Sequence, residues 1–393
     1  MAYTVLARRY RSQSFDDVVG QEPIARTLKN AIAAGRVAHA YLFCGTRGVG
    51  KTSMARIFAR ALNAPDTVSG SPREPEAQYP PEDVQQRMAQ AIMRGDDLNV
   101  IEIDGASNNS VEQARQLIAN AGLSPTTQAR YKIYIIDEVH MLTGSAFNAL
   151  LKTMEEPPAH VKFILCTTEP HKVPATIQSR CQRFDFRNIP TAQIAKHLTS
   201  VLQQENVPAQ EQLVWQVARL GNGSMRDALS LLDRLLATGQ SPLTVQVLEE
   251  MLGLPPQQQV VELVDALADG DVKATLEKAA GMLGSGISQD QLVEVLTERL
   301  RQLLLISACG ADSGLVELSE EDRRVAAQQA QRFDAAGLAY MIALCDHLQR
   351  QAKESPTPRA LLDACLVRLA LAEKMADVTA LLSGAAAGGE KKK

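Results

Sequence analysis

Eight residues near the N-terminus have the types and the spacing that bind phosphate. Every fixed residue of the phosphate-binding loop pattern G-x-x-x-x-G-K-[ST] is present in Gly45-Thr46-Arg47-Gly48-Val49-Gly50-Lys51-Thr52. Glycines let backbone N–H groups turn inward around the phosphates, and a following helix adds the positive end of its dipole. We expect Lys51 to pair with the β- and γ-phosphates and the Thr52 hydroxyl to be a ligand of Mg²⁺. The segment therefore predicts a nucleoside triphosphate site.

The sequence on both sides of this loop supports that prediction. The apolar run Ala40 to Cys44 is typical of a buried parallel strand, and residues 53–62 have the apolar spacing of a helix. The alternative is a glycine-rich turn that only happens to precede a helix. That alternative does not account for a complete motif between such a strand and such a helix.

Two carboxylates follow another predicted strand. The β-branched run at 131–136 ends in Asp137 and Glu138. Because parallel strands hold ligands at their carboxyl ends, we expect both acids to lie beside the phosphate loop. Asp137 would reach Mg²⁺ directly or through water, and Glu138 would orient or activate the water that attacks the γ-phosphate. A solvated Asp-Glu turn is the alternative.

A fourth strand-like run, at 163–167, is apolar and ends in Thr167, and a second threonine, Thr168, follows it. A hydroxyl at that position could sense the γ-phosphate or hold the attacking water. We expect Thr168 to have this role, with Thr167 as the second choice. The alternative is a threonine that bonds its own loop backbone.

The order of the predicted elements indicates an α/β domain followed by helices. Strand-like runs at 40–44, 99–103, 131–136 and 163–167 alternate with helical stretches, which is typical of a parallel sheet. We expect a nucleotide-binding α/β domain, a small helical domain, a second all-α domain and a flexible basic tail, with bounds 1–180, 181–243, 244–375 and 376–393. The proline-rich stretch 63–81 predicts an exposed loop.

The composition argues against a membrane protein, a secreted protein and a strongly basic DNA-binding protein. No apolar run has the length of a membrane span and no signal-peptide core begins the chain, so we expect a cytoplasmic protein. The six cysteines form no C-x-x-C pair and are interpreted as reduced core residues. The formal net charge of −4 gives no basic excess, so any nucleic-acid site must be local.

Seven segments together resemble those of the AAA+ clamp-loader ATPases, and more narrowly the gamma/tau (DnaX) subunits of bacterial DNA polymerase III. They are Leu6-Ala7-Arg8-Arg9-Tyr10-Arg11, Phe15 to Gln21, His39 to Phe43, the loop at 45–52, Ile136 to Leu142, Phe147 to Pro158 and Ser179-Arg180-Cys181. The resemblance covers nearly the whole chain. It implies a P-loop AAA+ domain, a helical lid domain and an all-α collar domain that oligomerises.

The resemblance also implies an activity and partners. The chain would be an ATPase that, with delta-type and delta-prime-type sister subunits in a pentamer, opens a sliding clamp and loads it on primer-template DNA. ATP binding would close the ATPase spiral around DNA, and hydrolysis would release the clamp. The cofactors would be ATP and Mg²⁺.

Two arginines acquire roles from the same resemblance. Arg180, in Ser179-Arg180-Cys181, would be an arginine finger for the ATP site of the neighbouring subunit, where its fork suits the charge on a transferring phosphoryl group. Arg226 would be a second sensor, which reaches from the lid to the nucleotide of its own subunit. Without the resemblance, both would be interpreted as local salt-bridge partners.

Clamp loaders hold DNA mostly by its phosphates, so few residues of each chain are needed. We expect five side chains to contact DNA, namely Asn108, Ser110, Arg115, Thr143 and Thr176. Simple helix N-caps are an equally good explanation of the Asn and Ser residues.

The chain departs from its bacterial relatives between the phosphate-loop helix and Asn99. Those relatives usually carry a four-cysteine zinc module there, whereas residues 63–98 have no cysteine and no histidine. We therefore expect no zinc, and a helix from about Pro81 to Met93 that packs its Val84, Met88 and Ile92 face on the ATPase domain. The early end of the chain resembles the shorter gamma form.

Two other functions stay open. Another AAA+ ATPase of DNA repair would share the fold, but such proteins usually lack the Ser-Arg-Cys segment. A noncatalytic structural subunit of the loader would share the family, but the intact Lys51, Thr52, Asp137 and Glu138 argue against it.

Overall fold

The computed structural model describes residues 4–65, 74, 78–107, 124–126, 129–353 and 355–372. They form two compact units, which we treat separately. The first lies within residues 1–204 and 217–234, and the second lies within 205–216 and 235–393. The helices between 191 and 252 are therefore divided between the units.

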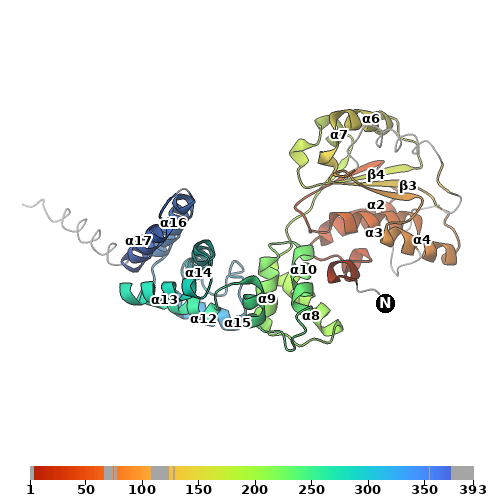
Figure 1. The fold of residues 1–393 in the computed structure, drawn as a ribbon. Helices are drawn as coiled ribbons and strands as arrows, with labels where there is room; N and C mark the ends of the chain where they lie inside the picture. The colour runs from red at the N-terminus through yellow and green to blue at the C-terminus, as the bar shows by residue number, and fades with distance from the viewer. Residues whose placement is uncertain are drawn as a thin grey trace, which may run out of the picture. The chain divides into compact units, whose positions relative to one another are not determined.

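A parallel sheet with the strand order β2-β3-β4-β1-β5 forms the centre of the first unit (Figure 1). Its described strands are β1 (Ala40–Cys44), β2 (Val100–Asp104), β3 (Lys132–Asp137), β4 (Val161–Thr167) and β5 (Gln182–Asp185). Cys44 pairs with Thr167 and Asp104 pairs with Asp137, so the carboxyl ends of these strands share one edge. The predicted parallel α/β fold is confirmed.

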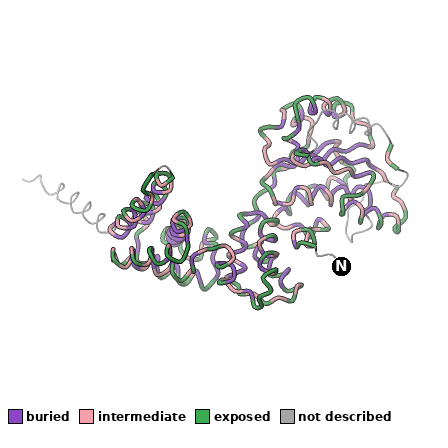
Figure 2. Tube along the Cα trace, viewed as in Figure 1, coloured by how far each residue is buried: buried purple, intermediate pink, exposed green. Residues whose placement is uncertain are grey.

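Helices cover both faces of this sheet (Figure 1). Side chains at Tyr41, Phe43 and Ile135 pack against α2 (Glu22–Ala33) and α3 (Lys51–Asn63). The alternate side chains, such as Leu42 and Ile136, share a second core cluster with α6 (Gly144–Glu155) and α7 (Ala175–Gln178). Because both faces are covered, the central strands read as continuous apolar runs and are buried (Figure 2).

The strand β5 lies beyond residue 180, where we expected the α/β domain to end. It pairs with β1 and completes the sheet. Gln182, Arg183 and Asp185 are exposed, so this edge strand has none of the apolar alternation that identifies a strand in sequence. The sheet therefore extends past the expected boundary.

The helix α4 (Glu82–Arg94) lies one residue from its expected position and packs as expected. Ile92 is 1% exposed in the core that includes α3, Met88 is buried, and Val84 is half-buried. Nearby, the buried Glu74 carboxylate forms an ion pair with Arg130 (2.6 Å) and accepts a hydrogen bond from the Tyr131 hydroxyl (3.1 Å). Apolar burial and the contacts of this carboxylate therefore hold this part of the first unit.

Shorter elements and four helices complete the region up to residue 252. The short elements are α1 (Leu6–Arg9), η1 (Phe15–Asp17), η3 (Val139–Met141) and η4 (Pro170–Lys172). The longer helices are α8 (Thr191–Gln204), α9 (Glu211–Leu220), α10 (Met225–Leu236) and α11 (Val245–Leu252).

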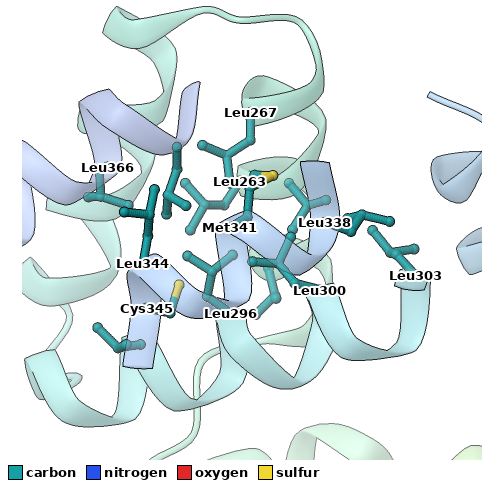
Figure 3. Close-up of a cluster of buried hydrophobic side chains, with 14 of the residues drawn as sticks. Leu263, Leu267, Leu296, Leu300, Leu303, Leu338, Met341, Leu344, Cys345 and Leu366 are labelled. Atoms are coloured by element: carbon teal, nitrogen blue, oxygen red, sulfur yellow. The ribbon is translucent and has the colours of Figure 1, made fainter. Parts of the chain in front are cut away.

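The second unit continues as an all-α fold, as predicted. Its further helices are α12 (Gln257–Ala268), α13 (Val272–Gly284), α14 (Gln289–Cys309), α15 (Glu320–Ala330), α16 (Ala335–Ala352) and α17 (Pro358–Ala370). They share one leucine-rich core, in which Leu296 and Leu300 of α14 lie beside Leu338 and Met341 of α16 (Figure 3). Among the described helices, none is both long and apolar enough to cross a membrane.

Candidate active site

A pocket of about 730 Å³ lies at the carboxyl edge of the sheet. Its lining residues come from the N-terminal segment, the loop between β1 and α3, the ends of β2 and β3, the helices α3, α4, α8 and α10, and Ile189 before α8. Of the eight residues predicted to bind phosphate, six line the pocket and two, Gly45 and Thr46, are not among its lining residues; the six are Arg47, Gly48, Val49, Gly50, Lys51 and Thr52. The phosphate loop therefore opens into a space of the size that holds a small ligand.

The glycines of the loop are needed for two different reasons. Gly45 and Gly48 have positive φ, and an added Cβ would lie 2.7 Å from the Phe186 carbonyl oxygen at Gly45 and 1.8 Å from the Ser224 hydroxyl oxygen at Gly48. Gly50 has open space around it but a φ of 99°, which side chains rarely adopt. It precedes the first residue of α3, so the N-terminus of that helix faces the pocket.

Lys51 lies buried inside the loop. Its Nζ donates to the carbonyl oxygens of Gly45 and Thr46, both at 2.8 Å. Burial lowers the pKa of the Lys51 ammonium, and the nearby Glu138 and Asp137 carboxylates oppose that effect. A cation held in this way is already positioned for phosphate oxygens.

Thr52 and Asp137 are in direct contact. The Thr52 hydroxyl donates to the Asp137 Oδ2 at 2.6 Å, so the first turn of α3 is joined to the end of β3. A hydroxyl and a carboxylate oxygen are ligands that Mg²⁺ prefers, and they lie beside the loop that would hold the phosphates. The predicted pair is thus suited to a magnesium ion.

Glu138 follows directly and has a φ of 45°, which is uncommon for a residue other than glycine. Its Oε2 accepts from the Thr168 hydroxyl at 3.0 Å and from the Thr168 N–H at 3.3 Å. Thr167, the second choice from sequence, is fully buried and contacts the His140 ring instead. The structure thus brings Thr168 to the carboxylate, and the strained turn aims Glu138 along the sheet edge.

Arg226 also lines the pocket. It lies in the first turn of α10, directly after the Ser224-Met225 segment whose Ser224 side chain sits over Gly48. On the other side, the Thr46 hydroxyl donates to the Asn188 Oδ1 at 2.6 Å. The loop therefore contacts both the segment that precedes α8 and the start of α10.

Arg180 is not among the described residues that line the pocket. Its guanidinium donates to the Thr176 carbonyl oxygen at 2.6 Å and to the Glu155 Oε1 at 2.7 Å. The side chain is 33% exposed. It is therefore available to a ligand outside its own pocket.

The residues that we expect to contact DNA are described only in part. Asn108, Ser110 and Arg115 lie outside the described residues. Thr143 and Thr176 are exposed, and the Thr143 hydroxyl caps α6 by accepting from the Ala146 N–H at 3.3 Å. Thr143 is therefore the cap of α6 as well as a candidate DNA contact.

The pocket has apolar lining residues that sequence reasoning missed. They are Val18, Val19, Ile189 and Leu229, and the lining also includes Tyr10 and Arg11 of the N-terminal segment and His197 of α8. Burial lowers the pKa of the Arg11 guanidinium, and the neighbouring Arg56 adds to this effect. These residues come from segments that are far apart in the chain, so no local motif predicts them. Only the segment 6–11, which contains Tyr10 and Arg11, was part of the family resemblance.

In the described part of the chain, no three histidine, cysteine or acidic side chains cluster in a way that could hold a metal ion. Most of the proline-rich stretch 63–81 lies outside that part. The expectation that the chain folds without zinc stays a prediction.

Three family models match the chain one after another. Residues 20–190 match a DNA polymerase III delta subunit model, and residues 193–241 match the ATPase lid domain of a DNA polymerase III clamp loader subunit. Residues 243–384 match domain III of the DNA polymerase III subunits gamma and tau.

Curated relatives agree with these models. The chain is 42% identical over 309 residues to the DNA polymerase III subunit tau/gamma of Haemophilus influenzae, and this match covers 78% of this chain and 43% of that protein. It is 39% identical over 307 residues to the DNA polymerase III subunit gamma of Buchnera aphidicola, and this match covers 78% of this chain and 81% of that protein. The chain spans about half the length of several of these relatives.

Among solved structures, the RuvB Holliday junction branch migration motor of Thermotoga maritima matches with a TM-score of 0.45 and 16% identity. The match covers 66% of this chain and 79% of that one. At that score the likeness adds nothing to what the family models give.

Proposed function

Because the chain belongs to the gamma/tau family of DNA polymerase III subunits, we propose that it is a catalytically active ATPase subunit of a replicative clamp loader. In this role it binds and hydrolyses ATP, together with sister subunits of the delta and delta-prime types in a pentamer. The cycle opens a sliding clamp and loads it on primer-template DNA. A cytoplasmic location follows from this role.

The observation that carries the proposal is a complete hydrolytic set in one pocket. Lys51 inside the loop, the Thr52–Asp137 contact and the Glu138–Thr168 contact all line or border the same space. A noncatalytic relative would have no reason to keep all three. This set therefore favours the active ATPase over the structural subunit.

Each residue of the set has a defined part in hydrolysis. Lys51 exchanges its bonds to the loop carbonyls for bonds to the β- and γ-phosphates, while the α3 N-terminus donates N–H groups to them. Thr52 and Asp137 would hold Mg²⁺, and the ion would supply positive charge to stabilise the phosphates. Glu138 accepts a hydrogen bond from the attacking water and orients it in line with the γ-phosphate. Thr168 holds the carboxylate, or the water itself, in that position.

The two arginines act at different sites. Arg226 reaches the nucleotide in its own subunit, because it lies in the first turn of α10 beside the phosphate loop. Arg180 acts on the neighbour's nucleotide, which agrees with a side chain that bonds Glu155 rather than facing its own pocket. In the assembly, the Arg180 guanidinium would give up its ion pair with the exposed Glu155 carboxylate and bind the γ-phosphate, which carries more negative charge.

The apolar lining residues of the pocket bind the base. Val18, Ile189 and Leu229 offer apolar surface, and Tyr10 offers a ring for stacking. Arg11 is positioned in this wall, near Arg56 and Arg226, where it can contact a phosphate or the ribose. The N-terminal segment is therefore part of the nucleotide site.

Five residues contact DNA in this proposal. Two are the exposed Thr143, at the start of α6, and Thr176, in the first turn of α7; the others are Asn108, Ser110 and Arg115. Thr143 and Thr176 offer hydroxyl and backbone groups suited to phosphate. This small contribution is consistent with a net charge of −4, since each subunit of a ring needs to supply only a few contacts.

The alternative function, another AAA+ ATPase of DNA repair, would have the same fold, so the family models and not the fold argue against it. The model that matches residues 193–241 belongs to a clamp loader subunit of DNA polymerase III, and the model that matches residues 243–384 belongs to the gamma and tau subunits. The Ser-Arg-Cys segment at 179–181 agrees with that assignment.

Reconstitution of the loader tests the proposal. The full chain, sister subunits, a labelled sliding clamp and primer-template DNA would be mixed, and clamp retained on closed circular DNA would be measured with and without ATP. We expect ATP-dependent loading that fails when Lys51→Ala replaces the wild-type chain. Equal loading with Lys51→Ala, or loading without ATP, would rule out an ATP-driven role for this chain.

A further inference from the structure

A buried histidine adjoins the hydrolytic set but belongs to none of the roles above. His140 lies in η3, and its side chain is only 6% exposed. Its Nδ1 is 3.0 Å from the Thr167 hydroxyl oxygen and 3.5 Å from the Glu138 Oε2. Its Nε2 is 3.3 Å from the Glu169 Oε1. Both ring nitrogens therefore face polar groups at the end of β4 or at Glu138.

The partners decide which nitrogen carries the proton. Lys172 donates to Glu169 at 2.8 Å and, as the main cause, lowers the pKa of that carboxyl, so Glu169 is an acceptor. We therefore assign the ring proton to Nε2, which lies 3.3 Å from the Glu169 Oε1. The Thr167 hydroxyl accepts from the Glu169 N–H at 3.0 Å, which leaves its own proton free to donate to Nδ1. Every donor in this arrangement has an acceptor.

This network holds the groups that hold Glu138. Thr168 follows Thr167 and donates to the Glu138 carboxylate through both its N–H and its hydroxyl. The His140 ring connects η3, which begins one residue after Glu138, with Thr167 and Glu169 on either side of Thr168. The ring thus fixes both ends of the Glu138–Thr168 contact.

We propose that His140 is a positioning residue for ATP hydrolysis, which keeps Glu138 in register with the attacking water by fixing the Thr167–Glu169 segment. The inference rests on the proposed ATPase function. Such a role differs from that of a buried histidine that only stabilises the fold, because it concerns the rate of the chemical step and not nucleotide affinity.

Kinetics of the full chain in the assembled loader test this role. We expect His140→Ala to lower kcat on the order of 10- to 100-fold, while the Kd for a non-hydrolysable ATP analogue stays unchanged. His140→Gln places an amide near the Nε2 position and can still donate to Glu169, so it should recover part of the lost kcat. His171→Ala is the matched control, since His171 is 73% exposed and lies 3.6 Å from the same Glu169. It should leave kcat unchanged.

A double mutant separates positioning from general stability. If His140 acts through Glu138, then adding His140→Ala to Glu138→Gln should cause no further loss in single-turnover hydrolysis. An additive loss, an unchanged kcat in the single variant, or a fall in nucleotide affinity that accounts for the whole effect would overturn the inference. Should His140→Ala not fold, His140→Gln decides: we expect a kcat below that of the wild type at unchanged nucleotide affinity, and a kcat equal to that of the wild type would overturn the inference. Wild-type chains that neither bind nor hydrolyse ATP would instead refute the proposed function.

Discussion

Glu138 has a left-handed backbone conformation, with a φ of 45°, and its N–H donates to the Asp137 carboxylate at 3.0 Å. Such a conformation costs free energy on the order of 1 to 3 kcal/mol, so it persists only where the surroundings enforce it. Here the enforcing contacts are two hydrogen bonds from Thr168 and one to Asp137. In this conformation the two adjacent carboxylates have different partners. Asp137 contacts Thr52, and Glu138 contacts Thr168 after the end of β4.

Arg180 gives a prediction at the same scale. Arg180→Ala should slow hydrolysis in the assembled loader by about 10³-fold or more, because a finger stabilises charge on the transferring phosphoryl group. Nucleotide affinity of the isolated chain should hardly change. Stability should also hardly change, since the Arg180–Glu155 pair is exposed and contributes only about 0 to 1 kcal/mol.

Arg183→Ala is the matched control for Arg180→Ala, because Arg183 also forms an exposed ion pair, with Asp185. It should leave turnover of the assembled loader unchanged. Equal damage to the isolated chain and to the complex by Arg180→Ala would show that this arginine does not act on a neighbour.

At the scale of elements, α4 is held by burial. Ile92→Ala should lower the free energy of unfolding of the first unit by about 2 to 5 kcal/mol, because Ile92 is 1% exposed in the core shared with α3. Gln90→Ala, on the exposed side of the same helix, should change it by less than about 0.5 kcal/mol. Denaturant unfolding followed by circular dichroism would measure both. Equal effects would mean that α4 does not depend on this packing.

The elements also show how far sequence reasoning reaches. The phosphate loop and the Asp137-Glu138 pair were predictable because each is a local motif at the end of an apolar strand. The edge strand β5 was missed because three of its four residues are exposed and polar. The apolar lining of the pocket was missed because Val18, Ile189 and Leu229 come to one pocket only in the folded chain.

His140 was missed for a different reason. A single histidine after a strand belongs to no sequence motif. The role that we propose for it depends on Glu138, Thr167 and Glu169, which lie at the ends of the paired strands β3 and β4. Its contact with Glu169 spans 29 residues, which no spacing rule addresses. Long-range polar contacts of this kind need coordinates.

At the scale of the whole molecule, the chain should fold without zinc. We expect the burial of α4 and the Glu74–Arg130–Tyr131 contacts to supply the stability that a metal would otherwise give to this region. Elemental analysis of untagged protein, purified without chelator, should find far less than one zinc per chain. Stoichiometric zinc that survives dialysis, with a Tm that falls on chelation, would overturn this account of residues 63–98.

The central claim is that this chain binds ATP through its loop and hydrolyses it through Glu138, as two separable steps. The measurement is nucleotide binding and steady-state hydrolysis by Lys51→Ala and Glu138→Gln chains, each in the assembled loader. We predict that Lys51→Ala loses ATP binding, whereas Glu138→Gln keeps wild-type affinity and loses turnover. Hydrolysis at the normal rate by Glu138→Gln, or unimpaired binding by Lys51→Ala, would contradict the account.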